Sequence, residues 1–98
     1  MEGVLLVRIL TPLKDVASFR CDALKLIEKE NEQGQGGSIG ILRGHLPAVI
    51  ALEFNSPVNA TAQGKEVFSA LVRGGFARVD RESVTILTPA ADVTLEKQ

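Results

Sequence analysis

The chain has 98 residues, of which 45% are hydrophobic and 23% charged, and its formal net charge at pH 7 is −1. This length fits one domain, residues 1–98, with a single hydrophobic core. The near-neutral balance argues against a nucleic-acid binder or an anionic-membrane binder, because both need a clustered basic surface. No apolar run approaches the ~20 residues of a membrane span. The start of the chain does not resemble a signal peptide either, so we expect a soluble, intracellular protein.

The first half of the chain predicts a strand and a hairpin. Residues 4–10 form an apolar run that Thr11 and Pro12 end. Residues 22–32, DALKLIEKENE, contain good helix formers, so this segment alone fits a helix or a strand equally well. The glycine-containing loop that follows favours a strand, because such loops commonly join paired strands. We therefore predict a hairpin around residues 31–37.

The second half alternates apolar and polar residues with a period of two, which predicts strands with one buried face. In residues 48–54 this alternation places Phe54 on the same side as Ile50, and residues 65–73 are apolar enough for a strand covered on both faces. Turn-forming residues separate the strands. Their spacing of roughly ten residues predicts an antiparallel β-sandwich or barrel. The predicted strands are residues 48–54, 58–62, 65–73 and 83–87, with turns at 63–64, 74–75 and 80–83.

The only histidine, His45, and the only cysteine, Cys21, lack partners for chemistry. A hydrolytic triad needs a nucleophile, a base and an orienting acid, and a metal site usually needs three or four ligands. No motif around these two residues supplies either set. We therefore predict no catalytic residue, no metal site and no cofactor, and we expect Cys21 to be a small buried apolar residue.

The segment 37–52, GSIGILRGHLPAVIAL, predicts a stiff turn with Arg43, His45 and Leu46 at its tip. Gly40 and Gly44 permit backbone conformations that a side chain would block, and Pro47 restricts how the chain enters the next strand. The turn is either an ordinary structural turn with a hydrogen-bonded histidine or a contact for another protein. Gly74 and Gly75 are interpreted as structural residues of a tight turn or a bulge between two strands.

Two stretches, residues 37–52 and ALVRGGFARVDRESVTIL at 70–87, resemble the epsilon subunit of F-type ATP synthases. The first has that family's glycine–hydrophobic pair followed by Gly-His, a hydrophobic residue and Pro. The second has a strand, Gly-Gly, a strand, a polar turn and a strand that begins Val-Thr. Thr11-Pro12 and Phe19 also stand where that family has a small polar residue and an aromatic. The resemblance covers nearly the whole chain and matches the family's N-terminal domain.

The resemblance implies an all-β fold: a flattened antiparallel β-sandwich of about ten strands in two sheets. It implies a non-catalytic central-stalk subunit that binds the gamma subunit and the membrane c-ring and couples ion translocation to ATP synthesis. That complex lies at the cytoplasmic face of the bacterial inner membrane. Candidate contacts are Thr11, His45 and Ile50 for gamma and Ser38 for the c-ring, with Arg43 and Leu46 on the same turn as His45.

Such a permanent interface predicts an exposed apolar patch on one sheet face. The alternative is a free-standing β-sandwich protein-binding module that shares only the fold. The chain departs from the family pattern in several places. It ends at DVTLEKQ without the family's C-terminal helical hairpin, so inhibition or nucleotide binding by that hairpin is not expected. Arg43 replaces a common proline, Ser38 replaces a frequent acid, and the loop 31–37 is about four residues longer than the family pattern suggests.

Overall fold

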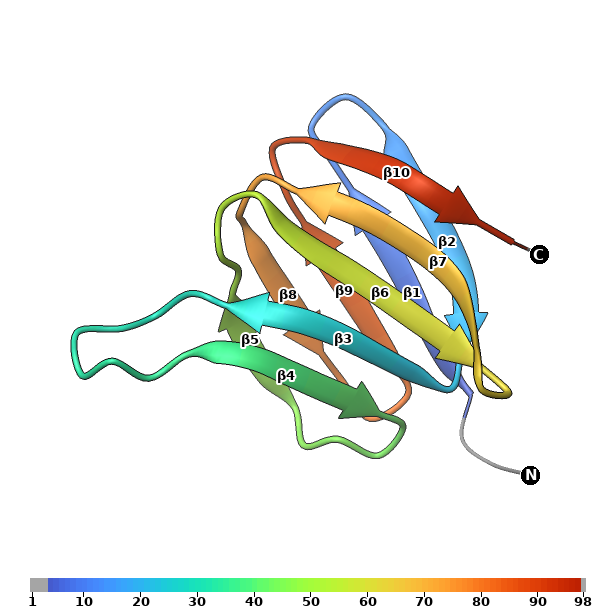
Figure 1. Ribbon diagram of the computed structural model, residues 1–98, viewed down its shortest axis with the longest axis horizontal. Helices are drawn as coiled ribbons and strands as arrows, with labels where there is room; N and C mark the ends of the chain where they lie inside the picture. The colour runs from blue at the N-terminus through green and yellow to red at the C-terminus, as the bar shows by residue number, and fades with distance from the viewer. Residues whose placement is uncertain (1–3, 98) are drawn as a thin grey trace.

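The computed structural model describes residues 4–97, which form ten strands and no helix (Figure 1). None of these residues therefore forms a helical membrane span. The segment that fitted a helix or a strand is a strand, as predicted. The strands are β1 (Leu5–Leu10), β2 (Asp15–Cys21), β3 (Ala23–Glu28), β4 (Gly37–Leu42), β5 (Ala48–Ala51), β6 (Ser56–Ala62), β7 (Lys65–Val72), β8 (Phe76–Val79), β9 (Ser83–Leu87) and β10 (Ala91–Glu96).

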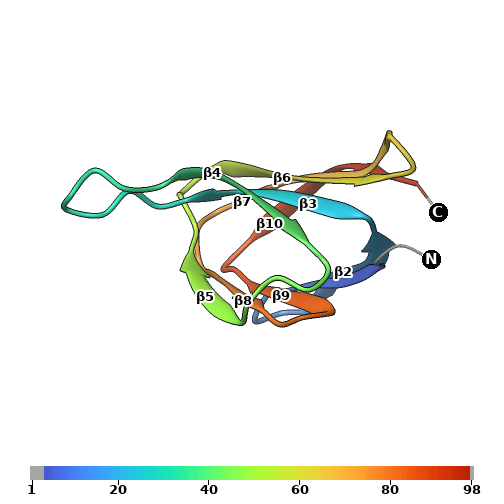
Figure 2. The same cartoon turned by 90° about the horizontal axis from the view of Figure 1, so that it is seen from below.

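The strands form two five-stranded sheets that stack as two layers (Figure 2). Sheet I has the order β2-β1-β9-β8-β5, and sheet II has the order β10-β7-β6-β3-β4. The predicted sandwich of about ten strands is therefore confirmed. One pairing departs from the antiparallel pattern, because β1 and β9 run parallel, with Leu6 opposite Ser83 and Leu10 opposite Leu87.

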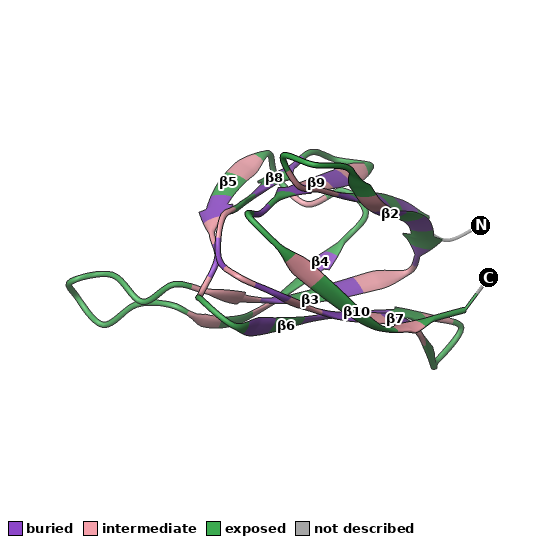
Figure 3. Ribbon diagram, turned by 90° about the horizontal axis from the view of Figure 1, so that it is seen from above, coloured by how far each residue is buried: buried purple, intermediate pink, exposed green. Residues whose placement is uncertain are grey.

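The core lies between the two sheets, and buried residues alternate with exposed ones along most strands (Figure 3). This alternation is the period of two that the sequence showed. Phe19 of sheet I and Phe68 of sheet II stack across the core with their ring centroids 4.2 Å apart. The other large, fully buried side chains are Leu5, Val7, Ile9, Leu24, Leu26, Ile41, Val58, Val72, Val79, Val84 and Ile86.

Two strand predictions were wrong in detail. The predicted strand 48–54 ends at Ala51, because the chain leaves sheet I there and turns at Asn55, whose φ is 57°. Phe54 consequently has 64% of its surface exposed instead of sharing the buried side with Ile50. The outer face of β7 is only half-buried, at Val67 and its alternate neighbours, so that strand is covered on one face rather than two.

Two connections between the sheets carry glycines that the sequence singled out. The first crossing, residues 43–47, joins β4 of sheet II to β5 of sheet I. The second crossing, residues 73–75, joins β7 of sheet II to β8 of sheet I. Each crossing leads from a strand of sheet II into a strand of sheet I, so each one links the two layers directly.

Candidate functional site

The first crossing is held in place by backbone hydrogen bonds. Gly44 has a φ of +91°, a left-handed conformation that favours glycine. The N–H of His45 donates to the carbonyl of Leu42, 3.1 Å away, which closes the turn. The N–H of Gly44 donates to the carbonyl of Arg81 in the turn between β8 and β9. The first crossing is therefore attached to the neighbouring hairpin of sheet I.

An ion pair reinforces this attachment. The Arg43 guanidinium donates to a carboxylate oxygen of Glu82 over 3.0 Å, and Glu82 belongs to the same β8–β9 turn. Both side chains are largely exposed, so the pair contributes only modestly to stability. Its main effect is to restrict Arg43, which therefore does not project freely from the tip.

His45 is half-buried and hydrogen-bonded within its own turn. Its Nδ1 lies 2.7 Å from the carbonyl oxygen of Leu46, which is the arrangement of an ordinary turn histidine. The neighbouring apolar side chains are exposed, at 60% for Leu42, 72% for Leu46 and 70% for Val49. The tip thus combines an anchored imidazole with an apolar surface, a pattern suited to contact with another protein.

Nothing around His45 or Cys21 suggests catalysis. Within residues 4–97, no three His, Cys, Asp or Glu side chains lie close enough together to hold a metal ion. Cys21 is buried, and desolvation by that burial, together with the nearby charge of Asp22, raises the pKa of its thiol to about 11. The thiol is therefore neutral at ordinary pH and a poor nucleophile.

The structure places Thr11 far along sheet I from His45. Ala48 directly follows the first crossing and pairs with Val79, in a row of cross-strand neighbours at one end of the sheet. Ala51 pairs with Phe76, in the row at the opposite end. Leu10 lies in the same row as Ala51, so Thr11 follows it at that second end. There Thr11 caps the β1–β2 turn through hydrogen bonds with Lys14.

The remaining predicted contacts are also dispersed. Ile50 is only 5% exposed and packs in the core, because it points inward from β5 while Val49 points outward. Ile50 therefore adds no exposed surface to the tip. Ser38 is exposed on β4 beside the long β3–β4 loop. Gly40 was expected in a turn, but it lies inside β4, opposite Lys25. Pro47 is exposed and leads into β5.

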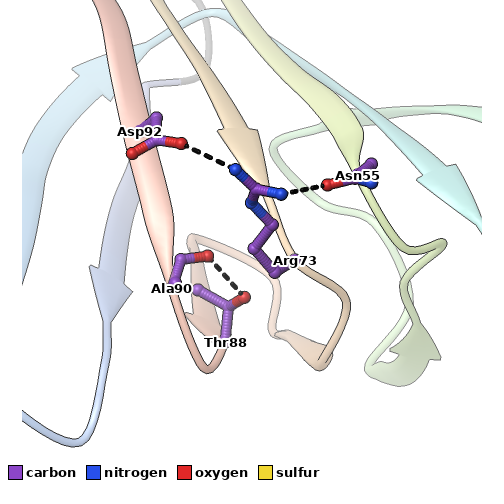
Figure 4. A network of polar contacts seen from close by, with 5 residues as sticks. All are labelled: Asn55, Arg73, Thr88, Ala90 and Asp92. Atoms are coloured by element: carbon purple, nitrogen blue, oxygen red, sulfur yellow. Dashed lines mark hydrogen bonds and ion pairs between the residues drawn. The ribbon is translucent and has the colours of Figure 1, made fainter.

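The second crossing is less exposed than the first, because Gly74 is buried and Arg73 and Gly75 are half-buried. Gly74 and Gly75 have φ values of +82° and +102°. A Cβ on Gly75 would overlap the carbonyl oxygen of Leu87 and lie 2.9 Å from the Cα of Thr88. The preceding Arg73 donates to Asn55 Oδ1 over 2.7 Å and to Asp92 Oδ2 over 3.2 Å, which ties three segments together (Figure 4). These features give the glycine pair a structural role.

Sequence reasoning missed a groove at the Thr11 end of sheet I. The groove has a volume of about 490 Å³ and is lined by Leu10, Thr11, Pro12, Asp15, Leu87, Thr88 and Pro89. Two copies of the tetrapeptide ILTP, at residues 9–12 and 86–89, form most of it. Their strands are parallel neighbours, with Ile9 opposite Ile86. The repeated tetrapeptide was the signal that could have located this groove.

Comparison with known proteins agrees with this architecture. Residues 5–93 match the family described as ATP synthase, Delta/Epsilon chain, beta-sandwich domain. The ATP synthase epsilon chain of Lawsonia intracellularis is 31% identical over 96 residues, which are 98% of this chain and 66% of that protein. The epsilon chain of a Cyanothece species is 45% identical over 56 residues, or 57% of this chain and 39% of that protein. The chain thus spans between about two fifths and two thirds of the length of these two relatives.

Two solved structures share the fold. One is from a Euglena gracilis mitochondrial ATP synthase structure of OSCP, F1 and the c-ring; its TM-score is 0.74 at 22% identity, over 95% of this chain and 55% of that chain. The other is from the central stalk and c-ring of the Tetrahymena thermophila enzyme; its TM-score is 0.65 at 20% identity, over 92% of this chain and 66% of that chain. From the match over residues 5–93 and the two-layered sandwich, we conclude that the chain belongs to the ATP synthase delta/epsilon β-sandwich domain family.

Proposed function

We propose that this domain acts as a non-catalytic central-stalk subunit of an F-type ATP synthase. In that role it binds the gamma subunit and the c-ring and couples ion translocation to ATP synthesis. The observation that carries the proposal is the family match over residues 5–93. The solved structures of the same fold, from assemblies that contain the c-ring, support it. A free-standing binding module is not favoured by this match.

The outer face of sheet I is the better candidate for gamma. Leu10, Leu87 and Phe76 are cross-strand neighbours in one row, and Phe76 and Leu87 are more than half exposed. Val49 and Leu46 continue the exposed apolar surface towards the first crossing. A stable rotor interface needs a large and fairly apolar area, and these exposed apolar side chains support placing gamma on this face. Arg8 and Arg78 interrupt it, each within 4.0 Å of an aspartate carboxylate, Asp15 and Asp80.

The outer face of sheet II differs in character. Lys25, Asn59 and Ser69 lie side by side on adjacent strands, and Asn59 donates hydrogen bonds to Glu66 and to Ser69. These polar groups satisfy one another or face solvent. This polar centre distinguishes sheet II from the exposed apolar row of Phe76 and Leu87 on sheet I.

The long β3–β4 loop and Ser38 are proposed to face the c-ring. This loop, residues 29–36, projects well beyond the sandwich (Figures 1 and 2). Asn31 holds it together, because its Oδ1 accepts hydrogen bonds from the N–H groups of Gln33 and Gln35. A Cβ on Gly36 would lie 2.7 Å from the Cα of Glu30, so the loop closes tightly on itself. In this arrangement the subunit lies at the cytoplasmic face of the bacterial inner membrane.

The direct test is binding to the gamma subunit of the same organism. We expect the purified chain to form a stoichiometric complex with gamma at micromolar concentration, seen by size-exclusion chromatography and calorimetry. Phe76→Glu, on the outer face of sheet I, should weaken the complex at least tenfold. Thr61→Glu, at an exposed position on the outer face of sheet II, is the control and should bind as the parent does. Absence of any complex with the parent chain would overturn the proposal.

A further inference from the structure

β4, at the outer edge of sheet II, differs from the other three strands that lie at a sheet edge (Figure 1). β2 and β10 each carry two charged side chains and a register shift against their neighbour. β5 has only four residues and follows Pro47. Charges, bulges, short length and proline all hinder pairing of an edge with another chain. β4 has six residues, GSIGIL, with no charged residue, no proline and no shift in its pairing with β3.

The outer edge of β4 presents backbone groups that can accept another strand. Successive residues of a strand direct their N–H and C=O groups alternately to its two sides, and β3 occupies only one side of β4. Within residues 4–97, the backbone of residues 37–41 forms no hydrogen bond other than those with β3. An added antiparallel strand would pair with the outward groups.

The sequence of β4 is complementary to itself in one antiparallel register. Directly opposite residues of an antiparallel pair point to the same face. A two-fold axis at Gly40 therefore places Ile39 opposite Ile41 of the second copy, on the core side, where Ile41 is buried and Ile39 is half-buried. Ser38 lies opposite Leu42 of the second copy, on the outer face. A Cβ on Gly40 would have no atom within 4 Å, so the surface at the axis is open.

Charges at the two ends of β4 match in the same register. Gly37 begins β4 and lies opposite Arg43 of the second copy, the residue that follows β4. The segment that leads towards Gly37 is acidic, because residues 28–32 contain three glutamates and one lysine. The Arg43 side chain is 45% exposed beside Glu82, and a guanidinium has donors for more than one carboxylate. Opposite charges thus meet at both ends of the paired strands, which favours a second copy as the occupant.

We propose that two copies of this chain pair through β4, antiparallel and about a two-fold axis at Gly40, so that sheet II continues from one copy into the other. This inference goes beyond the proposed function, because it concerns the chain outside the ATP synthase. A contact through one short strand belongs to the class of small, transient interfaces. The dimer is therefore a form of the free chain at high concentration.

The test is a charge exchange at the axis. Gly40 has ordinary strand geometry and open space on the outer face, so Gly40→Lys and Gly40→Glu should both fold. Like charges directly opposite each other destabilise a strand pair, so each variant alone should self-associate about fivefold more weakly than the parent. An equimolar mixture of the two should regain the parent's affinity. Thr61→Lys, at an exposed position of β6, is the control and should dimerise as the parent does.

Sedimentation equilibrium measures all four samples. A parent chain that stays monomeric up to its solubility limit would overturn the inference. Undiminished self-association of Gly40→Lys, or no recovery in the mixture, would overturn it as well.

A second measurement uses the parent chain alone and does not depend on how the variants fold. Amide hydrogen exchange is compared between dilute and concentrated samples. We expect alternate N–H groups of β4 to gain protection with concentration, whereas those of β10, at the opposite edge of sheet II, should not change. Dimerisation with unchanged exchange in β4 would place the contact elsewhere and refute the inference. Protection of β4 by gamma in a chain that does not self-associate would also refute it, while the proposed function would stand.

Discussion

The first and second crossings share several features. Each joins sheet II to sheet I, each contains a left-handed glycine, and each includes an arginine paired with a carboxylate. They differ in what surrounds the glycine. A Cβ on Gly75 would overlap the backbone of Leu87, whereas a Cβ on Gly44 would have no atom within 4 Å.

This difference separates two reasons for a glycine in a turn. At Gly75 no side chain fits, because the backbone of Leu87 and Thr88 occupies the position that a Cβ would take. At Gly44 the fold requires only a backbone conformation. The second crossing is therefore a packed joint between the layers. The first crossing is an exposed tip that can accept a partner without disturbing the core.

Gly75→Ala should have the largest effect on stability. The methyl group would displace the backbone near Leu87 and would also strain a left-handed residue, so we expect a loss of about 3 kcal/mol or more. Gly74→Ala is the matched control: its conformation is also left-handed, but the nearest atoms would be 3.8 Å away. It should lose only about 1 kcal/mol. Urea unfolding measures both, and equal losses would remove the steric distinction.

Gly44→Ala should cost about 1 kcal/mol, because only the left-handed conformation is penalised. Gly40→Ala provides the comparison within the same segment, since Gly40 has ordinary strand geometry and open space around it. That variant should be neutral or slightly stabilising in thermal unfolding. If Gly44→Ala proved as damaging as Gly75→Ala, the first crossing would also have to be a packed joint.

Arg73→Met tests the polar network of the second crossing. The guanidinium joins Asn55 and Asp92, so its removal should cost about 1 kcal/mol in urea unfolding. Lys25→Met, on the exposed outer face of sheet II, serves as the control for exchanging a cation for an apolar chain. It should change stability by less than about 0.5 kcal/mol. A similar small change in Arg73→Met would mean that the glycines alone determine this crossing.

The ion pair of the first crossing should contribute least. A double-mutant cycle of Arg43→Ala and Glu82→Ala should give a coupling free energy of about 0.5 kcal/mol or less, because both side chains are largely exposed. The equivalent cycle for Arg73 and Asp92 provides the reference. A larger coupling free energy for Arg43 and Glu82 than for Arg73 and Asp92 would contradict the expectation that the ion pair of the first crossing contributes least.

Much of the fold could be predicted from local patterns. The alternation along residues 58–62 and 83–87 identified strands with one buried face, and the loop after residue 31 favoured a hairpin over a helix. The end of β5 could not be predicted from alternation, because Phe54 continues the pattern. β5 ends at Ala51 because the backbone that follows pairs with β3 of sheet II, through the Glu28–Leu52 bridge and the Glu53 N–H to the carbonyl of Ile27.

The parallel pairing of β1 and β9 was beyond local reasoning, because β2 to β8 separate the two strands along the chain. Two strands that lie so far apart in the sequence produce no periodic pattern that would reveal their pairing. The repeated ILTP did mark the two strand ends, although a tetrapeptide is short enough to recur by chance.

The candidate site was predicted only in part. Alternation alone would have placed Ile50 in the core beside Ala48 and Leu52, whereas the family resemblance suggested a contact. The anchoring of the first crossing to Arg81 and Glu82 depends on the arrangement of the sheets. No spacing in the sequence brings those segments together, so this part of the site became visible only in three dimensions.

The parallel pair also bears on how the chain folds during synthesis. β1 lies in the interior of sheet I, with β2 on one side and β9 on the other, so its second neighbour is made only after β2 to β8. While the ribosome is still translating, β1 and β2 can pair as a hairpin but expose an unfilled edge. Closing so long a loop is entropically slow. Nascent chains should therefore remain vulnerable to aggregation and proteolysis until β9 has emerged.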